Sequence, residues 1–93
     1  MIVEKRIVIK NRLGLHARPA ALFVQVANKF DCEVTITKGR QKINGKSIMG
    51  IMMLAAGRGA VIHMTARGHD AEQAVAELEK LLSGDLDEKK SIL

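Results

Sequence analysis

The sequence predicts an α+β open-faced sandwich, in which a four-stranded antiparallel sheet carries three helices on one face. Apolar residues alternate with polar ones in four short segments, as in strands that bury one face. In three other segments the apolar residues recur at helical spacing. The order is strand, helix, strand, strand, helix, strand, helix, and helices stacked on a single sheet face satisfy that order. The other face of the sheet is then expected to be polar.

Alternation predicts the first strand, and helical spacing predicts the first helix. Ile7 and Ile9 alternate with neighbours on the other face, which predicts a strand over roughly residues 2–10. After a loop, apolar positions at helical spacing predict a helix over residues 17–28. Pro19 is tolerated there because the first turn of a helix needs no N–H donor.

The second and third strands form a predicted hairpin. Apolar and polar residues alternate from residue 32 to residue 38, which predicts the second strand. Gly39-Arg40 makes the turn, and residues 41–44 form the third strand. Cys32 is the only cysteine, which excludes an internal disulfide and a multi-cysteine zinc site. Its place on the apolar side of the strand predicts a buried thiol.

A short second helix and a fourth strand follow. Ser47 is the expected N-cap of an apolar helix over residues 48–54, which Gly57 is expected to end. Renewed alternation predicts a strand over residues 61–66, closed by Gly68.

The last helix is expected to follow Asp70. Asp70 and Gln73 resemble a capping box, and one apolar face runs from residue 71 to residue 82. The whole chain is expected to be one domain, with a folded core over residues 1–84 and a frayed, charged tail over residues 85–93.

Length and composition restrict the function. Ninety-three residues form a single core, too small for a separate substrate domain and catalytic cleft. No apolar run approaches the ~20 residues of a membrane span. Glu4, Lys5 and Arg6 interrupt the start before any signal-peptide core forms, so we expect a cytoplasmic protein without membrane insertion. As a separate expectation, the protein is a monomer.

His16 is the most informative candidate residue. It stands in Leu13-Gly14-Leu15-His16-Ala17-Arg18-Pro19, where a glycine-bearing loop is expected to pass into a helix. Free N–H groups and the positive end of the helix dipole favour a phosphate there. The same helix end and Arg18 disfavour a protonated ring, so a neutral, nucleophilic imidazole is expected. The N–H groups of Ala17 and Arg18 are the expected donors to a phosphate, and the Arg18 guanidinium can bind it bidentately.

Two motifs together point to a family. The run Gly14-Leu15-His16-Ala17-Arg18-Pro19-Ala20, with Lys46-Ser47-Ile48-Met49-Gly50-Ile51-Met52 further along, resembles HPr, the histidine-containing phosphocarrier of the bacterial phosphotransferase system. The resemblance implies that Nδ1 of His16 accepts a phosphoryl group from enzyme I and passes it to an EIIA-type acceptor for sugar uptake. It implies that Arg18 shields charge during transfer. No cofactor is implied for the carrier, although its donor would need magnesium.

The second motif adds regulation and docking. In the family the serine that matches Ser47 is phosphorylated by an ATP-dependent kinase, HPr kinase/phosphorylase, which implies transcriptional regulators as further partners. A short helix cannot bury all its sides, so Ile48, Met49 and Met52 are expected to be an exposed docking patch for partner proteins.

Other functions stay open at this point. The net charge of +5 raises the possibility of a nucleic-acid-binding domain, but aromatic residues are nearly absent and the cations are scattered. Acidic partner proteins explain the charge equally well. A carrier of the nitrogen-related branch, or a regulator of the same fold without phosphohistidine, would share the architecture. His63 and His69 are too isolated to predict a metal site and are expected to be ordinary surface residues.

Overall fold

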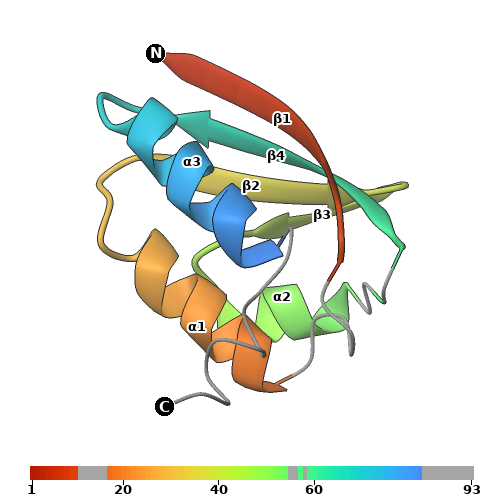
Figure 1. Cartoon of the computed structure of the whole chain (residues 1–93). Coiled ribbons are helices and arrows are strands. Elements are labelled where there is room, and N and C mark those ends of the chain that lie inside the picture. Colours follow the sequence, from red (N-terminus) through yellow and green to blue (C-terminus); the bar gives the residue numbers. More distant parts are fainter. Residues whose placement is uncertain (11–16, 55–56, 58, 83–93) are drawn as a thin grey trace.

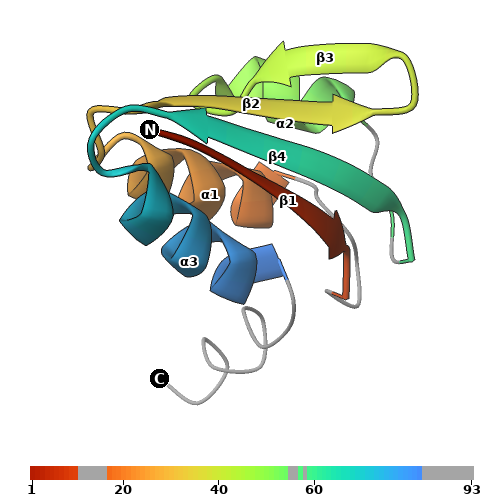
Figure 2. The ribbon, with the colours of Figure 1, turned by 90° about the horizontal axis from the view of Figure 1, so that it is seen from above.

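The computed structural model shows the predicted four-stranded antiparallel sheet with three helices on one face (Figures 1 and 2). The structure describes residues 1–10, 17–54, 57 and 59–82, with side chains described from residue 20 onward in the first helix. The strands are β1 (Ile2–Val8), β2 (Glu33–Lys38), β3 (Gln41–Asn44) and β4 (Val61–Arg67); the helices are α1 (Ala17–Ala27), α2 (Ile48–Met53) and α3 (Ala71–Leu82). None of the described helices is long and apolar enough to cross a membrane.

The sheet has the strand order β1-β4-β2-β3, with every neighbouring pair antiparallel. The first strand therefore lies beside the last one, and β3 forms the opposite edge. α3 packs on β1 and β4, α1 packs against α3 and α2, and α2 lies against β3. Figure 2 shows α1 and α3 together on one side of the sheet. None of the described helices covers the opposite side of the sheet.

Alternation along the strands places the apolar residues in the core, as predicted. The buried strand residues are Ile7, Val34, Ile36, Ile62, Met64 and Ala66, and they meet Phe23, Ile51, Leu78 and other helix residues. Each large apolar side chain that becomes fully buried contributes roughly 1.5–3 kcal/mol to folding. Cys32 is 1% exposed, so its prediction is confirmed, and burial raises the pKa of its thiol.

One predicted boundary differs by more than one residue, and one predicted helix terminator is wrong. β1 ends at Val8 rather than residue 10, because its partner strand begins only at Val61. Ile9 is nevertheless fully buried, and its N–H donates to the carbonyl of Ala60 at 2.9 Å. α2 ends at Met53, well before Gly57, so the prediction that Gly57 ends the helix is wrong.

The remaining helix and strand ends fall within one residue of prediction. α1 ends at Ala27, β2 starts at Glu33 and β4 extends to Arg67. Gly68 closes β4 with a φ of 148°, a value that favours glycine. A Cβ there would come 2.7 Å from the backbone of Cys32, so the turn is packed tightly against the start of β2. The predicted loop over residues 11–15 and the tail over residues 85–93 lie outside the described residues.

Candidate functional site

The first turn of α1 presents backbone donors directly behind His16. α1 begins at Ala17, as predicted, so His16 is the residue immediately before the helix. Ala17 and Arg18 carry backbone N–H groups without helical partners, Pro19 carries none, and no acidic residue lies in this turn. The end of the helix is thus suited to an anion. His16 itself, and the side chains of Ala17 and Arg18, lie outside what the structure describes.

The N-terminus of α2 is fixed by Ser47, as predicted. The Ser47 Oγ accepts a hydrogen bond from the Gly50 N–H at 3.0 Å, with extended backbone at the serine. Gly50 itself allows the helix to lie close to β3, because a Cβ at this position would be 3.3 Å from the Asn44 carbonyl and from Ile43. A serine N-cap typically contributes about 0.5–2 kcal/mol to stability.

The C-terminus of α2 is held by the β2–β3 hairpin. The Lys38 ammonium donates to the carbonyl of Leu54 at 3.1 Å, and the Gln41 amide donates to the carbonyl of Met53 at 3.2 Å. These two side chains satisfy carbonyls that helix ends otherwise leave without a partner. A terminating glycine is therefore not needed, which explains why Gly57 plays no such part.

One side of α2 is an exposed apolar surface, which we call the methionine patch. It consists of Ile48 (41% exposed), Met49 (66%), Met52 (42%) and Met53 (65%). Ile51 and Leu54, on the other side, are fully buried and anchor the helix. The predicted exposure of the first three residues is confirmed, and Met53 was missed. The signal was present in the spacing, because Met49, Met52 and Met53 stand at i, i+3 and i+4 on one helix face.

α2, which carries the methionine patch, lies near the first turn of α1. α1 and α2 pack against each other, and both ribbon views place the N-terminal end of α1 nearer to α2 than its C-terminal end (Figures 1 and 2). The start of α1 and the helix that carries Ser47 therefore lie on one side of the described structure.

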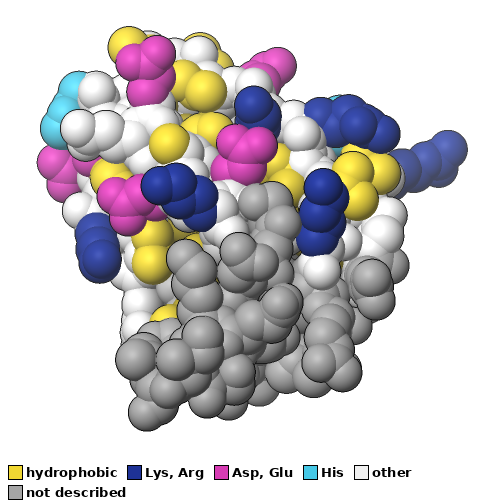
Figure 3. Space-filling view, viewed as in Figure 1, with side chains coloured by type: hydrophobic (Ala, Val, Ile, Leu, Met, Phe, Trp, Pro, Cys, Tyr) yellow, Lys and Arg dark blue, Asp and Glu magenta, His cyan; other side chains and the backbone are white. Residues whose placement is uncertain are grey.

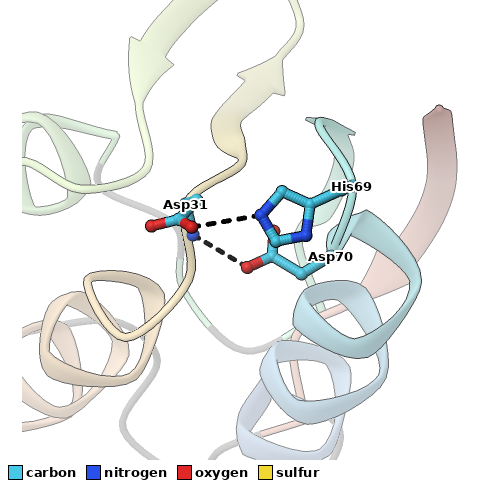
Figure 4. A group of neighbouring side chains, drawn as sticks. All are labelled: Asp31, His69 and Asp70. Carbon is cyan, nitrogen blue, oxygen red and sulfur yellow. Dashed lines mark hydrogen bonds and ion pairs between the residues drawn. The ribbon is translucent and has the colours of Figure 1, made fainter.

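A separate polar cluster joins the start of β2 to the start of α3 (Figure 4). The Asp70 carboxylate accepts hydrogen bonds from the N–H groups of Asp31 at 2.8 Å and Cys32 at 3.0 Å. His69 Nε2 lies 3.1 Å from the Asp31 carboxylate. The predicted capping box of Asp70 with Gln73 is wrong, because two donors from a distant loop hold the Asp70 oxygens instead.

We call Asp31, His69 and Asp70 the clasp, because their hydrogen bonds connect the start of β2 to the start of α3. One ligand atom from each of Asp31, His69 and Asp70 lies within 4.8 Å of the other two, a spacing that could admit a metal ion. Both Asp70 oxygens already accept backbone hydrogen bonds, however, and the side chains of Asp31 and His69 are largely exposed. His63 and His69 are both surface residues, as predicted.

Asp70 predicts a loss of stability in acid. The Asp31 N–H, helped by Cys32, holds the pKa of Asp70 below its ordinary value of 3.8. A carboxylate with a depressed folded pKa stabilises the fold above its unfolded pKa, and that contribution disappears as the pH falls through the folded value. Asp70→Asn should therefore unfold more easily at pH 7 and show a smaller further loss in acid than the wild type. Thermal unfolding at about pH 7, 4 and 2 measures this.

The control for this prediction is Glu72→Gln, which removes an exposed carboxylate from the same end of α3. It should keep the stability and the acid dependence of the wild type. An Asp70→Asn protein with the wild-type pH profile would show that the clasp contributes nothing to the pH dependence.

Comparison with known proteins assigns the chain to a family. Residues 3–84 match the family model described as the PTS HPr component phosphorylation site. The chain belongs to the HPr family. HPr proteins are phosphocarriers of the phosphotransferase system, so the chain is a phosphocarrier and not an enzyme.

Individual relatives agree with the HPr assignment. The chain is 49% identical over 77 residues to the HPr-like protein Crh of Halalkalibacterium halodurans, covering 83% of this chain and 92% of the relative. It is 46% identical over 83 residues to phosphocarrier protein HPr of Neisseria meningitidis serogroup A, covering 89% and 93%. A crystal structure of HPr from Bacillus anthracis matches with a TM-score of 0.85 and 48% identity, over 88% of this chain and 98% of that one.

Crh is also represented among the similar structures. A crystal structure of Crh from Bacillus subtilis matches with a TM-score of 0.70 and 41% identity, over 86% of this chain and 92% of that one. It is described as a dimer with a swapped domain. The predicted monomeric state of the present chain is therefore not confirmed.

Proposed function

We propose that this chain takes a phosphoryl group from enzyme I onto Nδ1 of His16 and passes it to an EIIA-type acceptor for sugar uptake. The supporting observation is the start of α1 at Ala17, directly behind the histidine, in a chain of the HPr family. The neutral ring nitrogen attacks phosphorus, and a N–P bond forms as the bond to the donor breaks. In the second half of the cycle that N–P bond breaks, and the ring returns to its neutral state.

The first turn of α1 would stabilise the transferred group. The N–H groups of Ala17 and Arg18 point along the helix axis toward its N-terminus, where the three phosphoryl oxygens would lie. The Arg18 guanidinium would add a bidentate contact that a lysine cannot reproduce. Because these donors face outward at the end of the helix, a docked partner can receive the group in line.

Arg18→Ala should leave the fold intact and slow transfer from enzyme I by about 10- to 100-fold, since a hydrogen bond to a charged group contributes about 1.5–3 kcal/mol. Rapid-quench measurement of phosphorylated carrier against time gives the rate. Arg18→Lys is the matched control, because it keeps the charge and loses the planar fork, and its rate should lie between the two. Equal rates in Arg18→Ala and wild type would remove Arg18 from the mechanism.

The methionine patch would be the docking surface for both the donor and the acceptors. Its flexible thioether side chains adapt to partner surfaces of different shape. Its place near the first turn of α1 would bring each partner's reacting residue to the same ring nitrogen. One shared surface also requires the partners to bind in turn, which fits a monomeric carrier in the cytoplasm.

Ser47 would be a regulatory phosphorylation site on the border of the methionine patch. Its hydroxyl caps α2, and Ile48 and Met49 follow it directly. A phosphate there would place negative charge at the edge of an apolar docking surface, where desolvation on docking is costly.

Ser47→Asp should keep the N-cap and the folded stability, because aspartate is also a good cap, yet weaken binding to enzyme I. Ser47→Ala should do the reverse, losing about 0.5–2 kcal/mol of stability while binding as well as the wild type. Calorimetric titration with enzyme I and thermal unfolding separate the two effects. Unchanged affinity in Ser47→Asp would mean that docking does not involve this side of α2.

A further inference from the structure

The methionine patch carries three thioethers whose chemical reactivity the phosphocarrier proposal does not use. Met49, Met52 and Met53 make up half of the six residues of α2, and they are 66%, 42% and 65% exposed. Met49 and Met53 stand one helical turn apart, with Met52 beside them on the same face. The sulfur of methionine accepts oxygen from a peroxide to give a sulfoxide, which is polar where the thioether is apolar. The patch therefore combines an exposed apolar surface with oxidisable atoms.

The exposed apolar side chains of the described residues are concentrated on α2. Four of the seven large ones belong to the methionine patch, and the other three are Met1, Ile2 and Val61 in or beside the strands β1 and β4. Over the described part of the face seen in Figure 3, charged side chains lie between the apolar ones. Three thioethers on one helix face are thus a local feature of α2.

The sulfur atoms in the core are shielded from a dissolved oxidant. Met64 is fully buried in β4, and Cys32 is 1% exposed. Burial, together with the neighbouring Asp70 carboxylate, raises the pKa of the Cys32 thiol and so disfavours the reactive thiolate. Of all the sulfur atoms in the chain, those of the methionine patch and of Met1 are therefore the ones that a peroxide reaches first.

α2 should stay folded when the patch is oxidised. Its packing against the core depends on Ile51 and Leu54, which are fully buried. Its two ends are held by the Ser47 hydroxyl and by the Lys38 and Gln41 side chains, and none of these hydrogen bonds involves a methionine side chain. A sulfoxide oxygen on the patch would be hydrated in the free protein. It would lose that water when a partner covers the patch, and a polar group buried without a hydrogen bond is unfavourable.

We propose that Met49, Met52 and Met53 are sites of reversible oxidation, and that their sulfoxides weaken the docking of enzyme I on the methionine patch. This inference rests on the proposed function, in which that surface receives enzyme I. The sulfur attacks one oxygen of hydrogen peroxide, a S–O bond forms as the O–O bond breaks, and the other oxygen leaves as water. The sulfur loses two electrons and the peroxide gains them. A methionine sulfoxide reductase reverses the step with two thiols, which form a disulfide while the oxygen leaves as water.

The test treats the full-length carrier with hydrogen peroxide, removes the peroxide with catalase, and then measures binding to enzyme I by calorimetric titration. Peptide mass mapping should find sulfoxide at Met49 and Met53 first and then at Met52, with Met64 unchanged. The oxidised carrier should bind enzyme I at least about tenfold more weakly than the untreated carrier. Incubation with a methionine sulfoxide reductase and a thiol reductant should restore the affinity.

The matched control is the triple variant Met49→Leu/Met52→Leu/Met53→Leu, which keeps an apolar patch but lacks its sulfur atoms. Met1, which is 64% exposed and lies outside α2, remains as an oxidisable thioether in this variant. Peroxide should oxidise Met1 and leave the affinity for enzyme I within about twofold of the untreated variant. Because each protein is compared with its own untreated form, any effect of leucine itself on docking cancels.

Three results would overturn the oxidation proposal. Equal affinity of the oxidised and untreated wild type would show that the sulfoxides do not impede docking. An equal loss of affinity in the peroxide-treated triple variant would place the effect outside the patch. Unfolding of the oxidised wild type, seen by circular dichroism, would replace a surface effect with a loss of structure.

Failure of the oxidation proposal is distinguishable from failure of the proposed function. An untreated carrier that neither binds enzyme I nor accepts a phosphoryl group would contradict the proposed function and the oxidation proposal together. Normal phosphorylation of the untreated carrier, with binding unchanged after oxidation, would contradict the oxidation proposal alone.

Discussion

His16→Ala should abolish phosphoryl transfer through this protein while leaving it folded. The methyl group of alanine offers no nitrogen to attack phosphorus, and no neighbouring residue of the motif can replace it. The described core is formed by residues of the strands, the helices and their connections between Ile7 and Leu82. Transfer of label from phosphoenolpyruvate through enzyme I to an EIIA-type acceptor should therefore fall to the level seen without carrier, with an unchanged thermal unfolding curve.

Two further histidines provide matched controls. His63 lies on the open sheet face and His69 lies in the clasp with Asp31, both at the surface. His63→Ala and His69→Ala should each support transfer at the wild-type rate. Residual transfer in His16→Ala together with a loss in either control would assign the chemistry to a different residue.

Met49→Asp should weaken binding to enzyme I by about tenfold or more, because a carboxylate buried in an apolar contact without a partner is strongly unfavourable. Met49 is 66% exposed in the free protein, so the change should cost little stability. Calorimetric titration measures the affinity. In a steady-state assay the loss should appear as a raised KM for the carrier.

The control for Met49→Asp is a similarly exposed apolar residue on the sheet. Ile2→Asp, at a position 58% exposed at the start of β1, makes the same change in charge and should bind enzyme I as the wild type does. Equal weakening by both variants would show that added charge, rather than the methionine patch, determines the affinity.

The sheet and its helices were predictable because their signals are local and repeated. Alternation places Ile36 and Ile62 in the core regardless of what surrounds them, and the Ser47 cap depends on an N–H group three residues away. Features that depend on distant partners were not predictable. Asp70 is held by the backbone of Asp31, 39 positions earlier, and its near neighbour Gln73 plays no part.

The end of α2 shows the same limit. Lys38 and Gln41 satisfy its last carbonyls from a neighbouring hairpin, so the glycine that sequence reasoning requires is unnecessary. Arg6, His63 and Lys42 are likewise scattered along the chain, and only the strand register places them in one row across the sheet. The candidate site is the opposite case: the chemistry proposed for it comes from the motif around His16, and the fold adds the helix start at Ala17 and the nearby helix α2.

Intact mass after incubation with phosphoenolpyruvate, magnesium and enzyme I tests the carrier function most directly. We predict the gain of one phosphoryl group, labile to acid and stable to alkali, that is absent from His16→Ala. No gain in mass with several enzyme I donors, on protein shown to be folded, would contradict the phosphocarrier proposal and favour a regulator of the same fold that carries no phosphohistidine.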